Sequence, residues 1–349
     1  MFLFGHLPHP LDHRTVMTSD YEQAQQIEDL QKLLRKTQAE AARNKRRTDD
    51  IVEAVYQAAS AAAKASGRGQ PLKRPAVDKR KARPEVALIH ATDWQLGKKT
   101  VSFGVETLAK RIDLFAEKVM RITDIQRRDH PVREAVLMLG GDMVEGLGIY
   151  ESQLYEIEAY LFDQLFEASR IMERLTRTMA GYFETVRIVC EYGNHGRIGK
   201  YGTMPKGDNI DRMAYRITRD RTKDLPNVTW QESDNWYQHF SIGNYSVLLV
   251  HGDEIRTYSG TPLFGIIKRV SSWAAGIVPT FDDCYMGHWH NPISATIGNG
   301  NRVFITGSPE SGNAYAAEHL AAQARPSQRL HFIDPDKGRV TGEFVVWLD

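Results

Sequence analysis

Five short apolar runs, each followed at once by polar side chains, constrain this chain more than any other sequence feature. We expect each run to be a β-strand, and helical stretches at residues 105–128 and 151–182 alternate with them, as in α/β domains. Polar groups that follow the carboxyl ends of such strands collect at one edge of a sheet, where sites lie. The runs span residues 86–91, 135–139, 186–191, 245–250 and 284–286.

The side chains after these runs are of the types that bind metal ions. Glycines flank them at four of the five places, which permits tight turns and close approach of the backbone. Each element alone is a weak signal, because a single histidine or a Gly-Asp pair after a strand is common in turns. Their joint occurrence in this order predicts one site. The residues are Asp93 and Gln95, Asp142, Asn194 and His195, His251, and His288 and His290.

The order of these motifs closely resembles the calcineurin-like metallophosphoesterase superfamily over residues 85–308. Asp93-Trp94 resembles the SbcD-type branch of DNA repair nucleases, and compact chains with this pattern are similar to phage and prophage phosphoesterases. The resemblance implies a metal-dependent phosphoric ester hydrolase. It also implies an α/β (α+β) fold in which two mixed β-sheets form a four-layer sandwich with flanking helices.

The resemblance further implies two divalent metal ions with an attacking hydroxide between them. Mn²⁺ is the expected metal, with Mg²⁺, Fe²⁺ or Zn²⁺ as alternatives, because the ligands mix nitrogen and oxygen. His195 would be catalytic, giving a proton to the leaving oxygen. The implied first ligand set is Asp93, Gln95, Asp142 and His290, and the implied second set is Asp142, Asn194, His251 and His288.

Two positions depart from the family pattern. Gln95 stands where a histidine is usual, and its amide oxygen is a weaker ligand. The first metal ion would then be labile, restricted to Mn²⁺ or Mg²⁺, or absent in the resting protein. Gly196 stands where an acidic residue usually follows the catalytic histidine, so another group must orient His195. Glu145 and Asp253 are both candidates for that role. These departures leave room for a catalytically degenerate protein.

A glycine-rich loop at residues 196–202 follows His195 directly. Its two cations and its aromatic residue predict contact with an anionic substrate, and the alternative is an ordinary solvent-exposed loop. The substrate-binding residues expected here are Arg197, Lys200 and Tyr201.

The N-terminal part of the chain has a different composition. Residues 1–17 lack the pattern of a signal peptide and are expected to be a poorly ordered leader. Residues 18–66 contain no proline and are rich in helix formers, residues 67–84 read as a basic linker, and residues 85–349 form the catalytic domain. We expect the helical segment to form homo-oligomers through apolar side chains at Ile27, Leu30, Leu34, Ile51, Val52 and Val55.

The net charge of +1 conceals an uneven distribution. Residues 32–83 contain 15 Lys and Arg against five Asp and Glu, so this segment carries +10 and the remainder about −9. A basic arm predicts a polyanionic partner, and the first hypothesis is a DNA or other nucleic-acid phosphodiesterase. The alternatives are a small-molecule or cyclic-nucleotide phosphodiesterase or phosphatase, and a non-catalytic metal-binding scaffold.

Two cysteines, Cys190 and Cys284, are too few for a disulfide framework or a cysteine-based zinc site, and we expect both to be buried. No apolar run approaches the roughly 20 residues of a membrane-spanning helix. We therefore expect no membrane association and a reducing compartment, the cytoplasm of a bacterial or phage-infected cell.

Overall fold

The computed structural model describes residues 28–40, 75–80, 83–150, 153–199, 201–202, 204–256, 262–298, 300–312 and 325–349, with isolated positions between 25 and 61. The chain divides into two compact units, Met1–Val55 and Tyr56–Asp349. The boundaries expected from the sequence at residues 17, 66 and 84 remain predictions.

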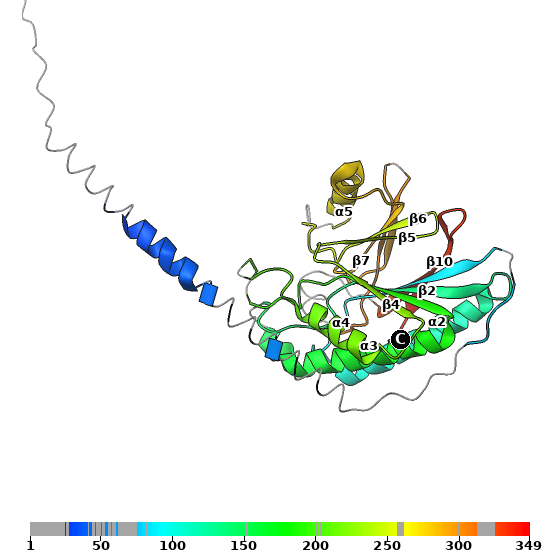
Figure 1. Cartoon of the computed structure of the whole chain (residues 1–349), viewed down its shortest axis with the longest axis horizontal. Coiled ribbons are helices and arrows are strands. Elements are labelled where there is room, and N and C mark those ends of the chain that lie inside the picture. Colours follow the sequence, from blue (N-terminus) through cyan, green and yellow to red (C-terminus); the bar gives the residue numbers. More distant parts are fainter. Residues whose placement is uncertain are drawn as a thin grey trace, which may run out of the picture. The chain divides into compact units, whose positions relative to one another are not determined.

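In the first unit, residues 28–40 form a continuous helix, drawn in blue in Figure 1. Leu30, Leu33 and Leu34 are 64%, 60% and 57% exposed on it. A surface ion pair of 2.8 Å joins Glu28 to Lys32 one turn on. The predicted leader and the apolar positions Ile27, Ile51, Val52 and Val55 lie outside the described residues.

A six-stranded sheet forms one half of the second unit. Four consecutive strands, β1 to β4, run parallel, as expected for strands connected by helices. β10 pairs antiparallel with β1 and with β11, and β10 and β11 form a C-terminal hairpin. The order is β11 (Arg339–Trp347), β10 (Ser327–Asp334), β1 (Glu85–Ala91), β2 (Val132–Leu139), β3 (Thr185–Cys190) and β4 (Val228–Glu232).

A five-stranded mixed sheet forms the other half. Its three central strands, β6, β7 and β9, are parallel, and the two outer strands are antiparallel to their neighbours. The order is β5 (Gln238–Ile242), β6 (Tyr245–Leu249), β7 (Asp283–Met286), β9 (Arg302–Ile305) and β8 (Ile293–Thr296).

The two sheets pack against each other through alternate side chains of their strands. Leu88 and Met138 of the first sheet belong to the same buried cluster as Val247, Leu249 and Phe304 of the second. All five are at most 1% exposed. Burying side chains of this size stabilises the fold by about 1.5–3 kcal/mol each, so this interface fixes how the two sheets face each other.

Helices cover both outer faces, which completes the predicted four layers (Figure 1). α2 (Val105–Gln126), α3 (Leu161–Tyr182) and α4 (Ile210–Arg221) lie on the six-stranded sheet. α5 (Pro262–Ser272) and the π-helical turn η2 (Trp273–Ile277) lie on the five-stranded sheet, where they share a second buried cluster with β6, β7 and β9. The predicted α/β sandwich is therefore confirmed.

The predicted helix over residues 151–182 is wrong for residues 153–160. A short 3₁₀ turn, η1 (Gln153–Glu156), stands there instead, and α3 begins only at Leu161. Hydrogen bonds to a distant loop explain the difference, because the amide of Glu158 donates to Gly97 O over 2.9 Å and Ile157 bridges to Lys98. The elements α4, α5, β4, β5 and β8 were not expected from the sequence as separate elements.

Cys190 and Cys284 are free and buried, as predicted. Among the helices described here, none combines the length and the apolar character that a membrane span requires.

Candidate metal centre

The loops that follow β1, β2, β3, β6 and β7 converge at one end of the two sheets. Within the first sheet, Asp93 N donates to Gly141 O and Gln95 N donates to Asp142 O, each over 3.0 Å. Within the second sheet, Gly287 N donates to His251 O over 3.0 Å. Parallel strands end at the same edge, so ligands that are far apart in sequence become neighbours.

The backbone is strained at the predicted ligands. Of the six described non-glycine residues with positive φ, five are predicted ligands, with φ between 46° and 64°. Left-handed conformations are uncommon for residues with a Cβ, cost about 1–3 kcal/mol each, and cluster at functional sites. The five are Asp93, Gln95, Asp142, His288 and His290.

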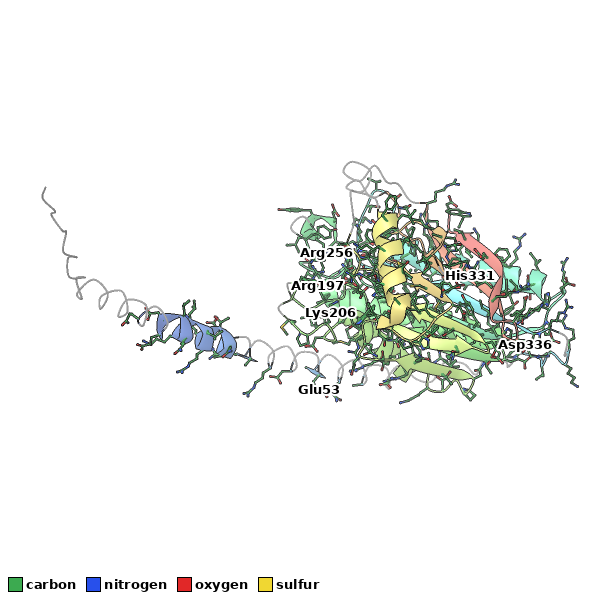
Figure 2. The ribbon with its side chains drawn as sticks, turned by 90° about the horizontal axis from the view of Figure 1, so that it is seen from above. Glu53, Arg197, Lys206, Arg256, His331 and Asp336 are labelled. Atoms are coloured by element: carbon green, nitrogen blue, oxygen red, sulfur yellow. The ribbon has the colours of Figure 1, made fainter. Side chains whose placement is uncertain are left out.

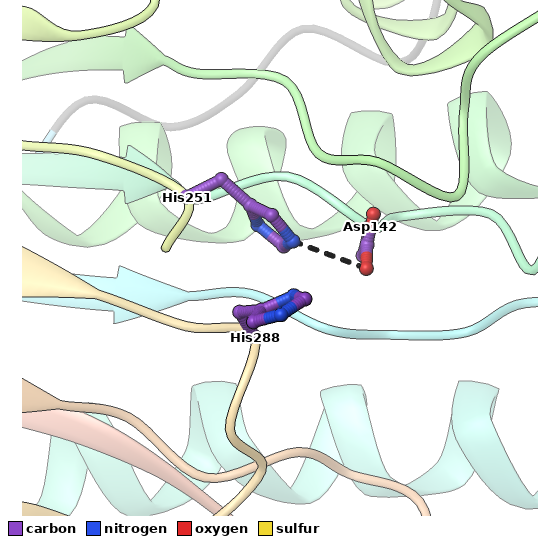
Figure 3. Close-up of side chains that lie close together, drawn as sticks. All are labelled: Asp142, His251 and His288. Carbon is purple, nitrogen blue, oxygen red and sulfur yellow. Dashed lines mark ion pairs between the residues drawn. The ribbon is translucent and has the colours of Figure 1, made fainter. Parts of the chain in front are cut away.

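Three predicted ligands form a compact, largely buried cluster (Figure 3). One ligand atom each from Asp142, His251 and His288 lies within 4.8 Å of the other two. His251 Nε2 is 3.1 Å from Asp142 Oδ2, and the rings of His251 and His288 are 5.2 Å apart. Such a group of a carboxylate and two imidazoles suits Mn²⁺, Fe²⁺ or Zn²⁺.

Asn194 joins this group, because its Oδ1 is 3.1 Å from His251 Nε2. On the other side of the ring, His251 Nδ1 is 2.9 Å from the carbonyl oxygen of Gly140. A donor at Nδ1 leaves Nε2 as the nitrogen that faces the centre, which is the usual arrangement of a metal-binding histidine. The structure thus brings all four residues of the predicted second ligand set together.

The predicted first set is assembled beside it. His290 Nε2 is 3.3 Å from Asp93 Oδ1 and 3.4 Å from Gln95 Nε2, which is itself 3.3 Å from Asp142 Oδ2. Gln95 Oε1 is buried and has no hydrogen-bond partner among the described residues. Exchange of the amide oxygen and nitrogen would turn this oxygen toward Asp142 and His290, where a divalent cation would satisfy it. The residues present therefore fit a metal pair that shares Asp142.

Charges within the cluster set the protonation of its members. Burial favours the neutral carboxyl of Asp142, but the nearby His251 and His195 outweigh it and hold the pKa of Asp142 well below its usual value. Burial and the positive charge of His251 lower the pKa of His288 to about 4.

A buried ion pair that was not expected from the sequence lies behind His290. His290 Nδ1 is 3.2 Å from Glu310 Oε2, and Glu310 Oε1 is 3.0 Å from Lys98 Nζ. Glu310 and Lys98 are only 5% and 6% exposed. Burial opposes the charge on His290, but Asp93 and Glu310 outweigh it and raise the pKa of His290 to about 10. Glu310 directs Nε2 toward Asp93, as carboxylates behind metal-binding histidines do.

Asp211, in the first turn of α4, was not expected from the sequence either. Its carboxylate accepts hydrogen bonds from the backbone amides of Asp142 (2.8 Å), Gly193 (3.0 Å), Met143 (3.0 Å) and Val144 (3.3 Å). The preceding Asn209 caps the helix and donates from Nδ2 to Gly193 O over 2.8 Å. One helix terminus thereby holds the two loops that carry Asp142 and Asn194.

The structure identifies the partner of His195. Its Nδ1 is 2.9 Å from the carbonyl oxygen of Glu145 and 3.4 Å from Glu145 Oε2, so of the two candidates Glu145 orients the ring. Burial opposes protonation, but Asp142 and Glu145 outweigh it and raise the pKa of His195 to about 9. A Cβ at Gly196 would lie 2.3 Å from Asn209 Oδ1, which explains why no acidic side chain stands there.

The three predicted substrate-binding residues differ in their surroundings. Arg197 donates to the carbonyl oxygens of Asn194 (2.8 Å) and Ile149 (2.9 Å), so much of its hydrogen-bonding capacity supports the loop. Tyr201 is 71% exposed. Lys200 lies outside the described residues.

Comparisons with known proteins give distant similarities. No family model matches the chain. The SPbeta prophage-derived uncharacterized protein YonJ of Bacillus subtilis is 22% identical over 214 residues, or 59% of this chain and 51% of the relative. The chain therefore spans about half the length of the curated relative it matches.

Solved structures also align at low similarity. A zinc complex of Vps29 from Entamoeba histolytica has 12% identity and a TM-score of 0.30, and covers 75% of this chain and 99% of its own. A predicted phosphoesterase from Streptococcus pneumoniae has 13% identity and a TM-score of 0.30, with 76% and 99% covered. A 5'-nucleotidase from Candida albicans has 9% identity and a TM-score of 0.32, with 80% and 54% covered. TM-scores this low do not establish a shared activity.

Replacing Asp211 with asparagine should weaken metal binding about 10–100-fold, the usual effect of removing a group that supports a ligand. An amide presents one oxygen and one NH₂ group to four backbone donors, so the loops after β2 and β3 lose part of their support. Calorimetric titration with Mn²⁺ measures the change. Asp163→Asn, an exposed substitution in the first turn of α3, is the matched control. Wild-type affinity for Mn²⁺ in Asp211→Asn would show that the loops after β2 and β3 keep their conformation without the Asp211 carboxylate.

Proposed function

We propose that the protein is a metal-dependent phosphoesterase of the calcineurin-like type that cleaves nucleic-acid phosphodiesters. One observation supports this most strongly: seven predicted ligands from five separate strand ends lie in one cluster, in two sets that share Asp142. A shared carboxylate between two sets of nitrogen and oxygen ligands is the arrangement of dinuclear hydrolases.

Bound metal ions and the residues that hold them would have different roles in the reaction. Two divalent ions held here would acidify an attacking water molecule and offset the negative charge of the phosphate oxygens. Asn194 and His251 fix one side of the centre, and Asp93 and His290 fix the other. Asp142 lies between them and keeps its negative charge at neutral pH.

His195 is placed to handle the proton of the leaving group. Its Nδ1 is engaged by Glu145, so Nε2 is the nitrogen open to a substrate. Gln153 Nε2 and Tyr150 Oη donate to Glu145 Oε1 over 2.9 and 3.1 Å, which fixes Glu145 in turn. A protonated imidazole held in this way can transfer its proton to the departing oxygen.

Asp142→Asn and His195→Ala should both abolish most hydrolysis but differ in metal content. Loss of a general acid lowers the rate about 10²–10⁴-fold, whereas loss of the shared carboxylate also releases metal. The assay is Mn²⁺-dependent cleavage of bis-p-nitrophenyl phosphate and end-labelled DNA, with bound metal measured by mass spectrometry. His130→Ala, outside the site, is the control. Equal metal loss in both variants would overturn the role given to His195.

The same assay distinguishes the alternative functions. Cleavage of the small ester without cleavage of DNA or RNA would favour a small-molecule phosphodiesterase. Inactivity on every ester, with metal still bound, would favour a metal-binding scaffold.

The basic arm supports nucleic acid as the substrate. Residues 32–83 carry a charge of +10, and cations that neutralise phosphates release condensed counterions. Binding should therefore weaken steeply as salt concentration rises.

Replacing Lys45, Arg46 and Arg47 with glutamine should make the salt dependence of DNA binding shallower. The slope of log K against log salt should fall by about 0.7–0.9 for each phosphate that is no longer neutralised. Fluorescence anisotropy at several salt concentrations measures this slope. A matched control replaces three exposed cations of the second unit, Lys110, Arg121 and Arg128. An equal change in both variants would rule out a specific part for the arm.

We also propose that the N-terminal helix associates with a second copy of itself. Leu30, Leu33 and Leu34 recur at helical spacing and are more than half exposed, and a short helix of this kind is marginally stable alone. Leu30→Asp with Leu34→Asp should convert an oligomer to a monomer, as measured by light scattering after size exclusion. Gln31→Asp with Gln38→Asp is the control for helix propensity. A monomeric wild type at micromolar concentration would contradict the proposal.

A further inference from the structure

A small pocket opens beside the candidate metal centre. It has a volume of about 140 Å³ and lies between described residues of the loop after β3, Tyr192 and Asn209 among others, and the residues Asp253 and Glu254. Asn194, a member of the second ligand set, belongs to its wall. A ligand in this pocket would therefore touch the residue that would also hold a metal ion.

The wall of the pocket is largely apolar and aromatic. The aromatic and apolar side chains that line it include Tyr192, Ile198, Tyr201 and Met204. Tyr201 is 71% exposed, so its ring is accessible to a ligand in the pocket. Arg212 lies 5.8 Å from the centre of the Tyr192 ring and helps to fix it. Two tyrosines at one small pocket favour a planar ring as its occupant.

Polar groups stand at the margin of the pocket. Glu254 and Lys206 both line it, and Figure 2 shows Lys206 next to Arg197 on one side of the second unit. A carboxyl group and an ammonium group together offer an acceptor and donors to the edge of a heterocycle. Lys206 also adds a positive charge where a phosphodiester backbone would approach.

The pocket is joined rigidly to the metal centre. Arg197 donates to Asn194 O and Ile149 O, and Ile210 N donates to Gly196 O over 2.7 Å. Asn209 forms a β-bridge with Arg197 as well as its hydrogen bond to Gly193 O. These contacts hold Arg197 and Asn209 of the pocket wall in place relative to Asn194.

The size of the pocket limits what can enter. Its 140 Å³ is below the roughly 300–1,000 Å³ of sites that enclose drug-sized ligands. There is room for one ring system and none for stacked base pairs. A base inside a duplex must leave the stack before it can enter such a pocket.

We propose that this pocket takes the base of the nucleotide whose phosphate lies at the metal centre, so that the substrate is single-stranded or locally unpaired nucleic acid. The proposal rests on the proposed phosphodiesterase function. The base would stack on Tyr201, contact the apolar wall, and present its polar edge to Glu254 and Lys206. Stacking on an aromatic ring tolerates every base, so little sequence preference is expected.

The test compares oligonucleotides that differ only in the presence of a base. One single-stranded oligonucleotide carries thymine at the cleaved position, and the other carries a tetrahydrofuran abasic residue with the same backbone. Wild-type protein with Mn²⁺ should cleave the first more efficiently in kcat/KM. Tyr201→Ala should reduce this ratio about 5- to 150-fold, the range expected for one base–aromatic stack. Tyr160→Ala, which removes a tyrosine that is 78% exposed outside the pocket, should leave the ratio unchanged.

Three outcomes would overturn the proposed base-binding role of the pocket. The first is equal cleavage of both oligonucleotides by the wild-type protein. The second is an equal loss of cleavage on both in Tyr201→Ala, and the third is faster cleavage of a fully paired duplex. A binding measurement without turnover uses metal-free protein and an oligonucleotide containing 2-aminopurine, whose fluorescence falls on stacking. Quenching that Tyr201→Ala removes supports the pocket even where no ester is cleaved, in which case the phosphodiesterase function alone fails. Absence of quenching in the wild-type protein would overturn the proposal that a base binds in this pocket.

Discussion

The metal centre depends on one buried carboxylate that is not itself a predicted ligand. Asp211 accepts four backbone hydrogen bonds from the loops after β2 and β3, and it lies on the helix that follows them. Burial and the negative charge of Asp142 raise the pKa of Asp211 to about 6, so its ionised form is retained at a cost. The backbone donors offset part of that cost because charge-assisted hydrogen bonds are strong. Backbone amides thus stabilise each of the two like charges, since the carboxylate of Asp142 accepts from the amide of His195 over 2.7 Å.

The predicted ligands also connect the two sheets. The ring of His251, from the five-stranded sheet, contacts Gly140 O of the six-stranded sheet. The backbone amide of His288 donates to both carboxylate oxygens of Asp93, over 3.0 and 2.9 Å. Between their facing surfaces the two sheets contact each other through buried apolar side chains. At this edge they contact each other through polar groups of the candidate site. Residues of the candidate site therefore also hold the two sheets together at this edge.

The strand ends and their ligands could be predicted because each motif is contiguous in the sequence. Groups that support the ligands could not, since Glu310 is far from His290 and Asp211 is far from Asp142 along the chain. Glu145 could be named as a candidate but not chosen over Asp253 without the fold. The helix expected from residue 151 failed for the same reason, because long-range hydrogen bonds to Gly97 and Lys98 override local propensity. Roles that depend on bound metal or substrate remain predictions.

At five predicted ligands, the left-handed backbone lowers the stability of the fold but keeps a possible ligand atom at the candidate site. At each of these positions glycine or asparagine would relieve strain of about 1–3 kcal/mol, and glycine would remove the ligand atom. Selection for thermal stability alone would favour replacement of these residues, whereas selection for metal binding would disfavour replacements that remove a ligand atom. The conformational cost of the left-handed backbone is thus concentrated at the candidate site, on five side chains that carry nitrogen or oxygen atoms able to bind a cation.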